Sequence, residues 1–196
     1  YEEAIASYDK AIEINPDYAM AWYGRGNSLD DLEKYEEAIA SYDKAIEINP
    51  DYADVWIRRG NSLLDLEKYE EAIASYDKAI EINPDYALAW NNRGISLGDL
   101  EKYEEAIASY DKALEINPDY AMAWNNRGWS LRNLEKYEEA IASYDRAIEI
   151  NPNDAWTWNA RGWSLYKLGN YEAALNSVEQ ALEINPNNGT ARANQT

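Results

Sequence analysis

The sequence predicts an all-α solenoid of stacked antiparallel helix hairpins, and one repeated segment carries most of that prediction. Copies of the segment YEEAIASYDKAIEINP, the first three identical and the later ones altered at some positions, begin at Tyr1, Tyr35, Tyr69, Tyr103, Tyr137 and Tyr171. The period is 34 residues throughout. A fixed period in this range is typical of small units that bury their apolar faces only against their neighbours. The chain is therefore expected to form a linear stack of units rather than one globular core.

The repeated segment predicts an amphipathic helix, called the B helix below. In residues 35–48, Ala38, Tyr42 and Ala45 recur every three or four positions, while acidic residues fill the opposite side. This spacing puts the apolar side chains on one face of a helix. An Asn-Pro pair ends each copy, as at Pro50. Pro suits the first position of a following helix, and the Asn is expected to cap that helix.

The residues before each copy predict a second helix, called the A helix, because Trp22, Gly26 and Leu29 in residues 19–32 have helical spacing. An A helix and the B helix after it make one hairpin. The predicted boundaries are a B helix over 1–16, five hairpins over 17–50, 51–84, 85–118, 119–152 and 153–186, and a tail or truncated next repeat over 187–196. Because no A helix precedes the first B helix, we expect an array cut from a longer protein.

The hairpin resembles a known repeat. The residues that carry the resemblance, at the offsets of the tetratricopeptide repeat pattern, are Trp22, Gly26, Ala38, Tyr42, Ala45 and Pro50. The resemblance recurs along nearly the whole chain and implies a right-handed superhelix whose A helices line a concave groove that holds peptides. Arg25 and Leu29 stand where that family usually has Leu and an aromatic residue. Both recur in every copy, so the expected fold is unchanged.

The composition excludes most catalytic and redox chemistry. The 196 residues contain no Cys and no His, and 37 acidic residues against 18 basic ones give a net charge of −19. Without thiols or imidazoles there is no disulfide, no thiol nucleophile and no zinc site of the usual kind. The charge repels phosphate backbones and anionic bilayers. We expect a cytoplasmic protein that is not an enzyme, with no cofactor, no metal, and neither nucleic acid nor membrane as a partner.

The five A-helix copies separate packing positions from candidate binding positions. Trp22, Arg25 and Gly26 have identical counterparts in every copy. A Gly inside a helix costs about 1 kcal/mol relative to Ala, so its recurrence predicts that another helix crosses too close for a Cβ atom. The Arg column is expected to pair with carboxylates of the B helices.

Five columns of the A helix vary between copies, and their spacing of i, i+3, i+4, i+7 and i+10 predicts one stripe on one helix face. By the family resemblance, this stripe is the peptide groove. The predicted groove residues are Met20, Tyr23, Asn27, Asp54, Ile57, Asn61, Leu88, Asn91, Asn92, Ile95, Met122, Asn125, Asn126, Trp129, Arg132, Trp156, Asn159, Trp163, Tyr166 and Lys167.

Aromatic residues gather in the last two A helices. Trp129, Trp156, Trp163 and Tyr166 lie on variable columns. Such side chains lose little rotamer entropy on binding and dominate interface hot spots, so they are candidate anchors for a ligand. The alternative is that they cover an otherwise exposed final repeat.

A row of carboxamides forms a second candidate feature of the stripe. Asn91, Asn92, Asn125, Asn126 and Asn159 lie on neighbouring columns. Each carboxamide both donates and accepts, so the row could hold the backbone of an extended peptide. The alternative is that these residues are solvated or pair with the Arg column.

Charge along the stripe predicts the chemistry of the partner. Asp54 and Asp65 mark its N-terminal part, and Arg132 and Lys167 its C-terminal part. We expect a peptide with apolar anchors and some basic residues. The family's carboxylate clamp for Hsp70 and Hsp90 C-termini is rejected, because Ile57 and other residues replace its Lys residues and leave it without charge-assisted bonds.

The sequence therefore predicts a non-catalytic module that binds a peptide or protein segment in the A-helix groove. The alternative is a self-assembling or consensus-like engineered scaffold without a dedicated ligand. Near-identical copies and uncapped ends would suit end-to-end or groove-mediated self-association.

Overall fold

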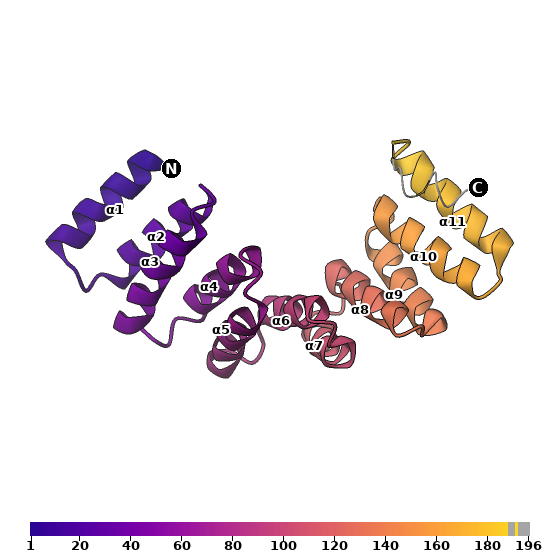
Figure 1. The fold of residues 1–196 in the computed structure, drawn as a ribbon, viewed down its shortest axis with the longest axis horizontal. Coiled ribbons are helices and arrows are strands. Elements are labelled where there is room, and N and C mark those ends of the chain that lie inside the picture. Colours follow the sequence, from indigo (N-terminus) through magenta and orange to yellow (C-terminus); the bar gives the residue numbers. More distant parts are fainter. Residues whose placement is uncertain (188–190, 192–196) are drawn as a thin grey trace. The chain divides into compact units, whose positions relative to one another are not determined.

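The computed structural model describes residues 1–187 and residue 191, and these residues form eleven α-helices and no strand (Figure 1). The chain divides into two compact units, Tyr1–Leu100 and Glu101–Thr196. Unit 1 contains α1 (Glu2–Ile14), α2 (Ala19–Asp30), α3 (Tyr35–Ile48), α4 (Ala53–Asp65), α5 (Tyr69–Ile82) and α6 (Ala87–Asp99). Unit 2 contains α7 (Tyr103–Ile116), α8 (Ala121–Asn133), α9 (Tyr137–Ile150), α10 (Ala155–Lys167) and α11 (Tyr171–Ile184).

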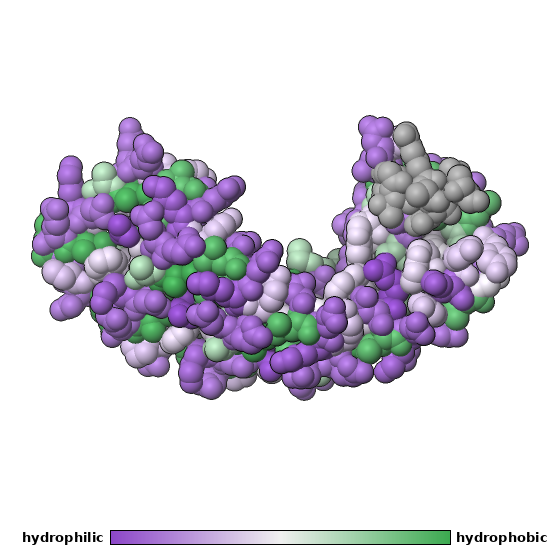
Figure 2. All heavy atoms as spheres, viewed as in Figure 1, coloured by the Kyte–Doolittle hydropathy of each residue, from purple (hydrophilic) through white to green (hydrophobic). Residues whose placement is uncertain are grey.

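The predicted all-α array of helix hairpins is confirmed within each unit. The even-numbered helices are the A helices and the odd-numbered ones the B helices, and each packs against the next within its unit. The boundary between the units falls between α6 and α7, inside the predicted hairpin 85–118. Hydrophilic residues cover most of the visible surface of both units (Figure 2). Most of the predicted tail over 187–196 lies outside the described residues, except for Asn187 and Ala191.

The turn between a B helix and the next A helix differs from the prediction. The helix α2 begins at Ala19 rather than at Pro16, and its N-cap residue makes no side-chain hydrogen bond. The Asn15 side chain instead accepts from the Asp17 backbone N–H at 3.2 Å, which closes a turn around the Pro. The indole Nε1 of Trp22 donates to the Pro16 carbonyl oxygen at 2.9 Å. The same Trp bond recurs in all five A helices, so this invariant residue ties each A helix to its preceding turn.

The turn from an A helix to its B helix uses a left-handed residue. Glu33 has a φ of 58°, and the next N–H, that of Lys34, donates back to the Leu29 carbonyl at 2.9 Å. This conformation favours glycine, yet Glu holds the position in four copies and only the last has a glycine, Gly169, with a φ of 77°. The hairpin geometry therefore stabilises a backbone conformation that Glu alone disfavours.

The recurrent glycine marks the close helix crossing that the sequence predicts. A Cβ atom added to Gly26 would lie 2.4 Å from the Tyr42 ring, and one added to Gly60 would lie 2.5 Å from the Tyr76 ring. Each Tyr is fully buried. The B helix thus lays an aromatic ring directly on the A-helix backbone, where no larger residue than Gly fits.

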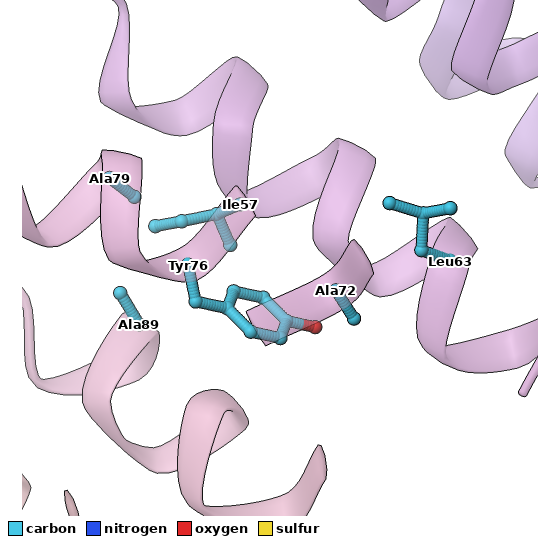
Figure 3. Close-up of a cluster of buried hydrophobic side chains, with 6 residues drawn as sticks. All are labelled: Ile57, Leu63, Ala72, Tyr76, Ala79 and Ala89. Atoms are coloured by element: carbon cyan, nitrogen blue, oxygen red, sulfur yellow. The ribbon is translucent and has the colours of Figure 1, made fainter. Parts of the chain in front are cut away.

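The core of unit 1 is assembled across consecutive helices. Figure 3 shows a cluster that α4, α5 and α6 build together, and its members are Ile57, Leu63, Ala72, Tyr76, Ala79 and Ala89. Half of the cluster is alanine, which lets the helices approach closely around the Tyr76 ring. The first helix, α1, has no buried residue.

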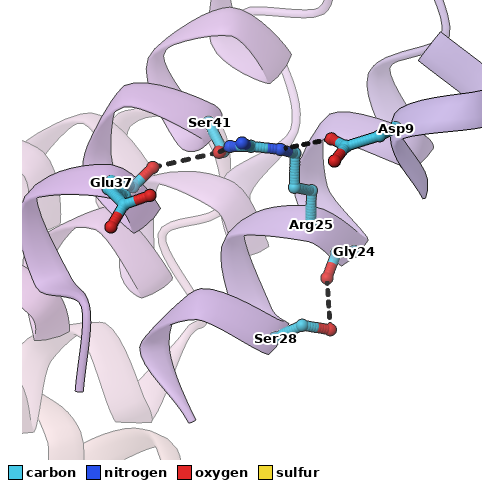
Figure 4. A network of polar contacts seen from close by, with 6 residues as sticks. All are labelled: Asp9, Gly24, Arg25, Ser28, Glu37 and Ser41. Carbon is cyan, nitrogen blue, oxygen red and sulfur yellow. Dashed lines mark hydrogen bonds and ion pairs between the residues drawn. The ribbon is translucent and has the colours of Figure 1, made fainter. Parts of the chain in front are cut away.

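An arginine clamp, formed by Arg25 and its equivalents, joins three consecutive helices (Figure 4). The Nε of Arg25 donates to Asp9 on α1 at 2.8 Å, and its Nη1 donates to Ser41 on α3 at 2.7 Å. The pairing with B-helix carboxylates, predicted from the sequence, is confirmed at every clamp, with Nε to Oδ1 distances of 2.6 to 2.8 Å. The same bonds to a Ser are made by Arg59, Arg127 and Arg161.

We predict that the clamp pair contributes more to stability than an exposed ion pair on the same helix. Asp43→Ala should lower the free energy of unfolding by about 1 to 2 kcal/mol, because it removes the charged acceptor of the mostly buried Arg59. Glu47→Ala breaks the exposed pair with Lys44 and should cost less than about 0.5 kcal/mol. Urea unfolding followed by circular dichroism measures both. Equal losses would contradict the role of the clamp.

Candidate binding surface on the A helices

One of the predicted groove columns belongs to the core instead. Ile57, Asn91 and Asn159 are 3%, 0% and 8% exposed. Ile57 packs in the cluster around Tyr76, and the half-buried Tyr23 of the same column has its ring 5.3 Å from that of Tyr52. For Ile57, Asn91 and Asn159 the prediction that this column lines the groove is corrected, because their side chains are buried, whereas Tyr23 and Asn125 of the same column are half-buried.

The first column of the stripe is the open one. Its apolar members Met20, Leu88, Met122 and Trp156 are 39% to 55% exposed, and Tyr166, at the end of the stripe, is 59% exposed. Lys167 is also exposed. The remaining predicted groove residues of these helices are half-buried, and they are Asp54, Asn27, Asn61, Asn92, Ile95, Asn125, Asn126, Trp129, Arg132 and Trp163. The column that contains Gly24, Arg58 and Ala160 varies in exposure. Gly24 and Ala160 are buried, whereas Arg58 is exposed.

In unit 1 the carboxamides bind each other and the core tyrosines. Asn27 accepts from the Tyr42 hydroxyl at 2.9 Å, and Asn61 accepts from the Tyr76 hydroxyl at 2.9 Å. The Nδ2 of Asn92 donates to the same Asn61 oxygen at 2.9 Å. These amides therefore link neighbouring helices and one repeat to the next. Asn27 and Asn61 belong to the predicted groove but not to the predicted row of carboxamides, and both accept from a core tyrosine.

In unit 1 a second network surrounds the start of α4 and includes residues that the sequence analysis did not select. The Tyr86 hydroxyl donates to Asp54, which raises the pKa of Tyr86 to about 12. Arg58 hydrogen-bonds Tyr23. Tyr86 lies in the turn before α6, outside the columns that were compared. Tyr18, Tyr52 and Tyr120 hold the same position in other copies, so Tyr86 does not stand out by variation between copies.

Carboxylates gather where α2 and α4 end. Asp30 accepts from the Ser62 hydroxyl, and Asp65 lies close enough to Asp30 to feel its charge. Burial, and then the Asp30 charge, raise the pKa of Asp65 above its ordinary value of 3.8. No group of three or more acidic residues within the described part of the chain is arranged to hold a metal ion.

In unit 2 the variable tryptophans pack on B-helix tyrosines. Trp129 meets Tyr103 edge to face with ring centroids 5.6 Å apart, and Trp163 meets Tyr137 in the same way at 5.8 Å. The Arg132 Cζ and the Lys167 Nζ lie 5.1 and 5.0 Å from the centroid of the Trp163 ring. Trp129 and Trp163 are therefore partly structural, as the covering alternative expects.

Trp156 and Tyr166 leave large ring areas open. Trp156 is 46% exposed, and its ring meets Tyr144 edge to face at 6.2 Å. Tyr166 is 59% exposed and packs only partly, against Tyr171 at 5.5 Å. Asn125 donates to Asp154 at 3.0 Å and accepts from Thr157 at 2.8 Å, so it joins α8 to the start of α10. The open part of unit 2 is thus aromatic rather than carboxamide.

The Tyr144 hydroxyl is the structural counterpart of those of Tyr42 and Tyr76, but it has lost its acceptor. It is fully buried, and no described residue accepts a hydrogen bond from it. The acceptor in the other two hairpins, Asn27 or Asn61, is replaced in this hairpin by Trp129. An unsatisfied buried hydroxyl costs about 1 to 3 kcal/mol.

We predict that the same substitution lowers stability at Tyr76 but not at Tyr144. Tyr76→Phe should lower the free energy of unfolding by about 1 kcal/mol, because it removes a buried hydrogen bond to Asn61. Tyr144→Phe should leave stability unchanged or raise it, since no bond is lost. Thermal and urea unfolding of the two variants provide the test, and an equal loss in both would show that Tyr144 is satisfied in solution.

We also predict a pH-dependent effect at Asp65. Because its folded pKa is raised, the folded state binds this proton more tightly, and ionisation costs stability as the pH rises through the folded pKa. Asp65→Asn should therefore raise the melting temperature at pH 7, and the gain should vanish below pH 3.8, where the native carboxyl is protonated in both states. Asp85→Asn, in an exposed turn, is the control for the charge change. A gain that persists in acid would contradict the assignment.

Comparisons with known proteins agree with the repeat geometry. Profiles described as "Tetratricopeptide repeat" match residues 92–155, residues 19–52 and 155–188, and residues 41–74, and a profile described as "TPR repeat" matches residues 1–32 and 60–100. A search of curated protein sequences finds no match. No helix in the described part of the chain is long and apolar enough to cross a membrane.

Solved structures share the fold. The structure titled "Crystal structure of YrrB: a TPR protein with an unusual peptide-binding site" matches with a TM-score of 0.78 at 27% identity, covering 95% of this chain and 96% of that chain. A MamA structure matches with a TM-score of 0.79 at 21% identity over 86% and 92% of the two chains. MamA 41-end from Desulfovibrio magneticus RS-1 matches at 0.80 and 17% identity over 87% and 97%. The chain belongs to the tetratricopeptide repeat family.

Proposed function

We propose that this chain is a non-catalytic interaction module that binds a peptide segment of another protein along the open column of its A helices. The supporting observation is the exposure of apolar side chains at one A-helix position, Met20 and Leu88 in unit 1 and Met122 and Trp156 in unit 2, with Asp54 at the same position of α4. Apolar residues repeated on one face of a polar protein are typical of an interaction site. The match to YrrB, described as a TPR protein with an unusual peptide-binding site, supports this proposal.

The partner segment is expected to carry apolar anchors and some basic residues. Trp156 and Tyr166 offer large, rigid surfaces of the kind that supply binding hot spots. In unit 1, Asp54, Asp65 and Asp99 supply negative charge at A helices, and burial raises the pKa of Asp99. A Lys or Arg of the partner near these carboxylates would be steered by their charge, and added salt should slow its association.

The test is a selection of random peptides against the chain, followed by affinity measurements on alanine variants. Trp156→Ala should weaken a selected peptide about thirtyfold, or about 2 kcal/mol, because it removes an anchor. Leu175→Ala is the matched control, since Leu175 is 44% exposed against 46% for Trp156 but lies on the B helix α11. Circular dichroism confirms that each variant folds. Failure to select any peptide, or equal affinities for Trp156→Ala and the native chain, would favour the scaffold alternative.

A further inference from the structure

Two tryptophans of unit 2 hold the same position in consecutive A helices and have the same surroundings. Trp129 lies on α8 and Trp163 on α10, 34 residues further along the chain. Each ring meets the first tyrosine of the preceding B helix edge to face. The interplanar angle is 73° between Trp129 and Tyr103 and 68° between Trp163 and Tyr137. The two indoles are therefore held in similar orientations and are displaced from each other by one repeat.

The indole N–H groups of these two residues are open donors, unlike those of the packing tryptophans. The Nε1 of Trp124, for example, donates to a Pro carbonyl at 2.9 Å. Trp129 and Trp163 donate to no residue in the part of the chain that the structure describes. In that part, the buried side-chain atoms without a partner belong to Ser130 and Tyr144, so the two half-buried indoles have nitrogens that reach solvent.

The spacing of the two donors selects the conformation of a segment that accepts from both. Some Cα atoms of α8 and α10 lie within 8 Å of each other, and packed helices have axes about 8 to 10 Å apart. A polyproline II helix has three residues per turn, so its carbonyls i and i+3 point the same way about 9 Å apart. In a β-strand, carbonyls on one side recur about every 6.7 Å. In an α-helix, the carbonyls are already bonded internally. The donors therefore match a polyproline II segment.

The occupant is argued from charge complementarity. Arg132 and Lys167 lie over the Trp163 ring and form no ion pair with any described residue, so they add positive donors beside the indoles. The carboxylate at the start of α10, Asp154, already accepts from three donors. A Pro-rich segment brings carbonyl oxygens with partial negative charge, and its Pro residues have no N–H that needs an acceptor. Because such a segment needs no net charge, the −19 of the chain does not repel it.

We propose that Trp129 and Trp163 form a docking site for a Pro-rich segment in the polyproline II conformation, with the two indole N–H groups donating to its carbonyls i and i+3. The inference rests on the proposed peptide-binding function and deepens it. Pro rings of the segment pack on the aromatic surface between the donors, which is how aromatic-lined grooves hold polyproline II ligands. The site is continuous with the open column, because Trp156 lies two turns before Trp163 on the same face of α10.

The test selects a phage library of random 12-residue peptides against the native chain. Enriched peptides should share two Pro residues three positions apart. For a synthetic copy of one such peptide, Trp129→Phe/Trp163→Phe should lower the affinity about tenfold or more, because Phe keeps an aromatic ring but has no N–H. Tyr18→Phe is the matched control, since it removes a polar hydrogen from a half-exposed ring in unit 1, and it should leave the affinity within about twofold.

Two further measurements separate hydrogen bonding from loss of ring area and from misfolding. In proton–nitrogen correlation NMR spectra of the native chain, the indole N–H signals of Trp129 and Trp163 should move downfield when the peptide is added, because they gain acceptors. The signal of Trp124, which is already bonded to the Pro118 carbonyl, should stay in place. A peptide with Pro also at the two positions between its Pro pair should keep its affinity within about threefold, because it stays in polyproline II and needs no N–H there.

The outcomes distinguish this inference from the proposed function. Enriched peptides without the Pro spacing, or an affinity that survives Trp129→Phe/Trp163→Phe, would overturn the docking site and leave peptide binding standing. Indole signals of Trp129 and Trp163 that do not move in the complex would do the same, even if the double variant fails to fold. A large loss of affinity on adding the extra Pro residues would indicate a strand-like segment and overturn the polyproline II conformation. Failure to enrich any peptide would overturn both proposals.

Discussion

The arginine clamp is the interaction on which each unit depends. A hairpin repeat can bury its apolar face only against a neighbour. Apolar packing has no preferred direction, so directional hydrogen bonds are needed to set the register between neighbouring hairpins. The Arg59 guanidinium does this, because its donors point to Asp43 on the preceding B helix and Ser75 on the following one. A planar guanidinium with fixed donor directions suits that task better than an ammonium group would. Its charge is paired within the unit, with Asp43.

The glycine and tyrosine columns form the second layer of the same architecture. The Tyr76 ring lies on Gly60, and its hydroxyl reaches Asn61, so one side chain links the helix crossing to the polar row of the A helix. Asn61 then accepts from Asn92 of the next A helix. Packing and polar contacts are thus coupled along unit 1. Asn61, a polar residue of the variable stripe, links α4 to α5 and to α6.

Unit 2 departs from this pattern where binding is proposed. Trp129 stands where Asn27 and Asn61 supply an amide acceptor in unit 1. The buried Tyr144 hydroxyl is therefore left without a hydrogen-bond partner among the described residues, which destabilises this hairpin. On the same helix as Trp129, Arg132 contacts the Trp163 ring. Local departures from an otherwise repeated and satisfied network are typical of functional positions, because folding alone would not favour them. The repeated copies make these departures visible.

The sequence by itself determined the helices, their hairpin order, the close crossing at Gly26 and the pairing of the clamp arginines. All of these follow from the 34-residue period and from spacing within single helices. Only the tertiary structure decided that Ile57 is core and that Tyr144 lacks an acceptor. Helical periodicity shows which residues share a face, but the angle between neighbouring hairpins sets which face is covered. That angle arises from contacts between residues of different repeats, which no single helix encodes.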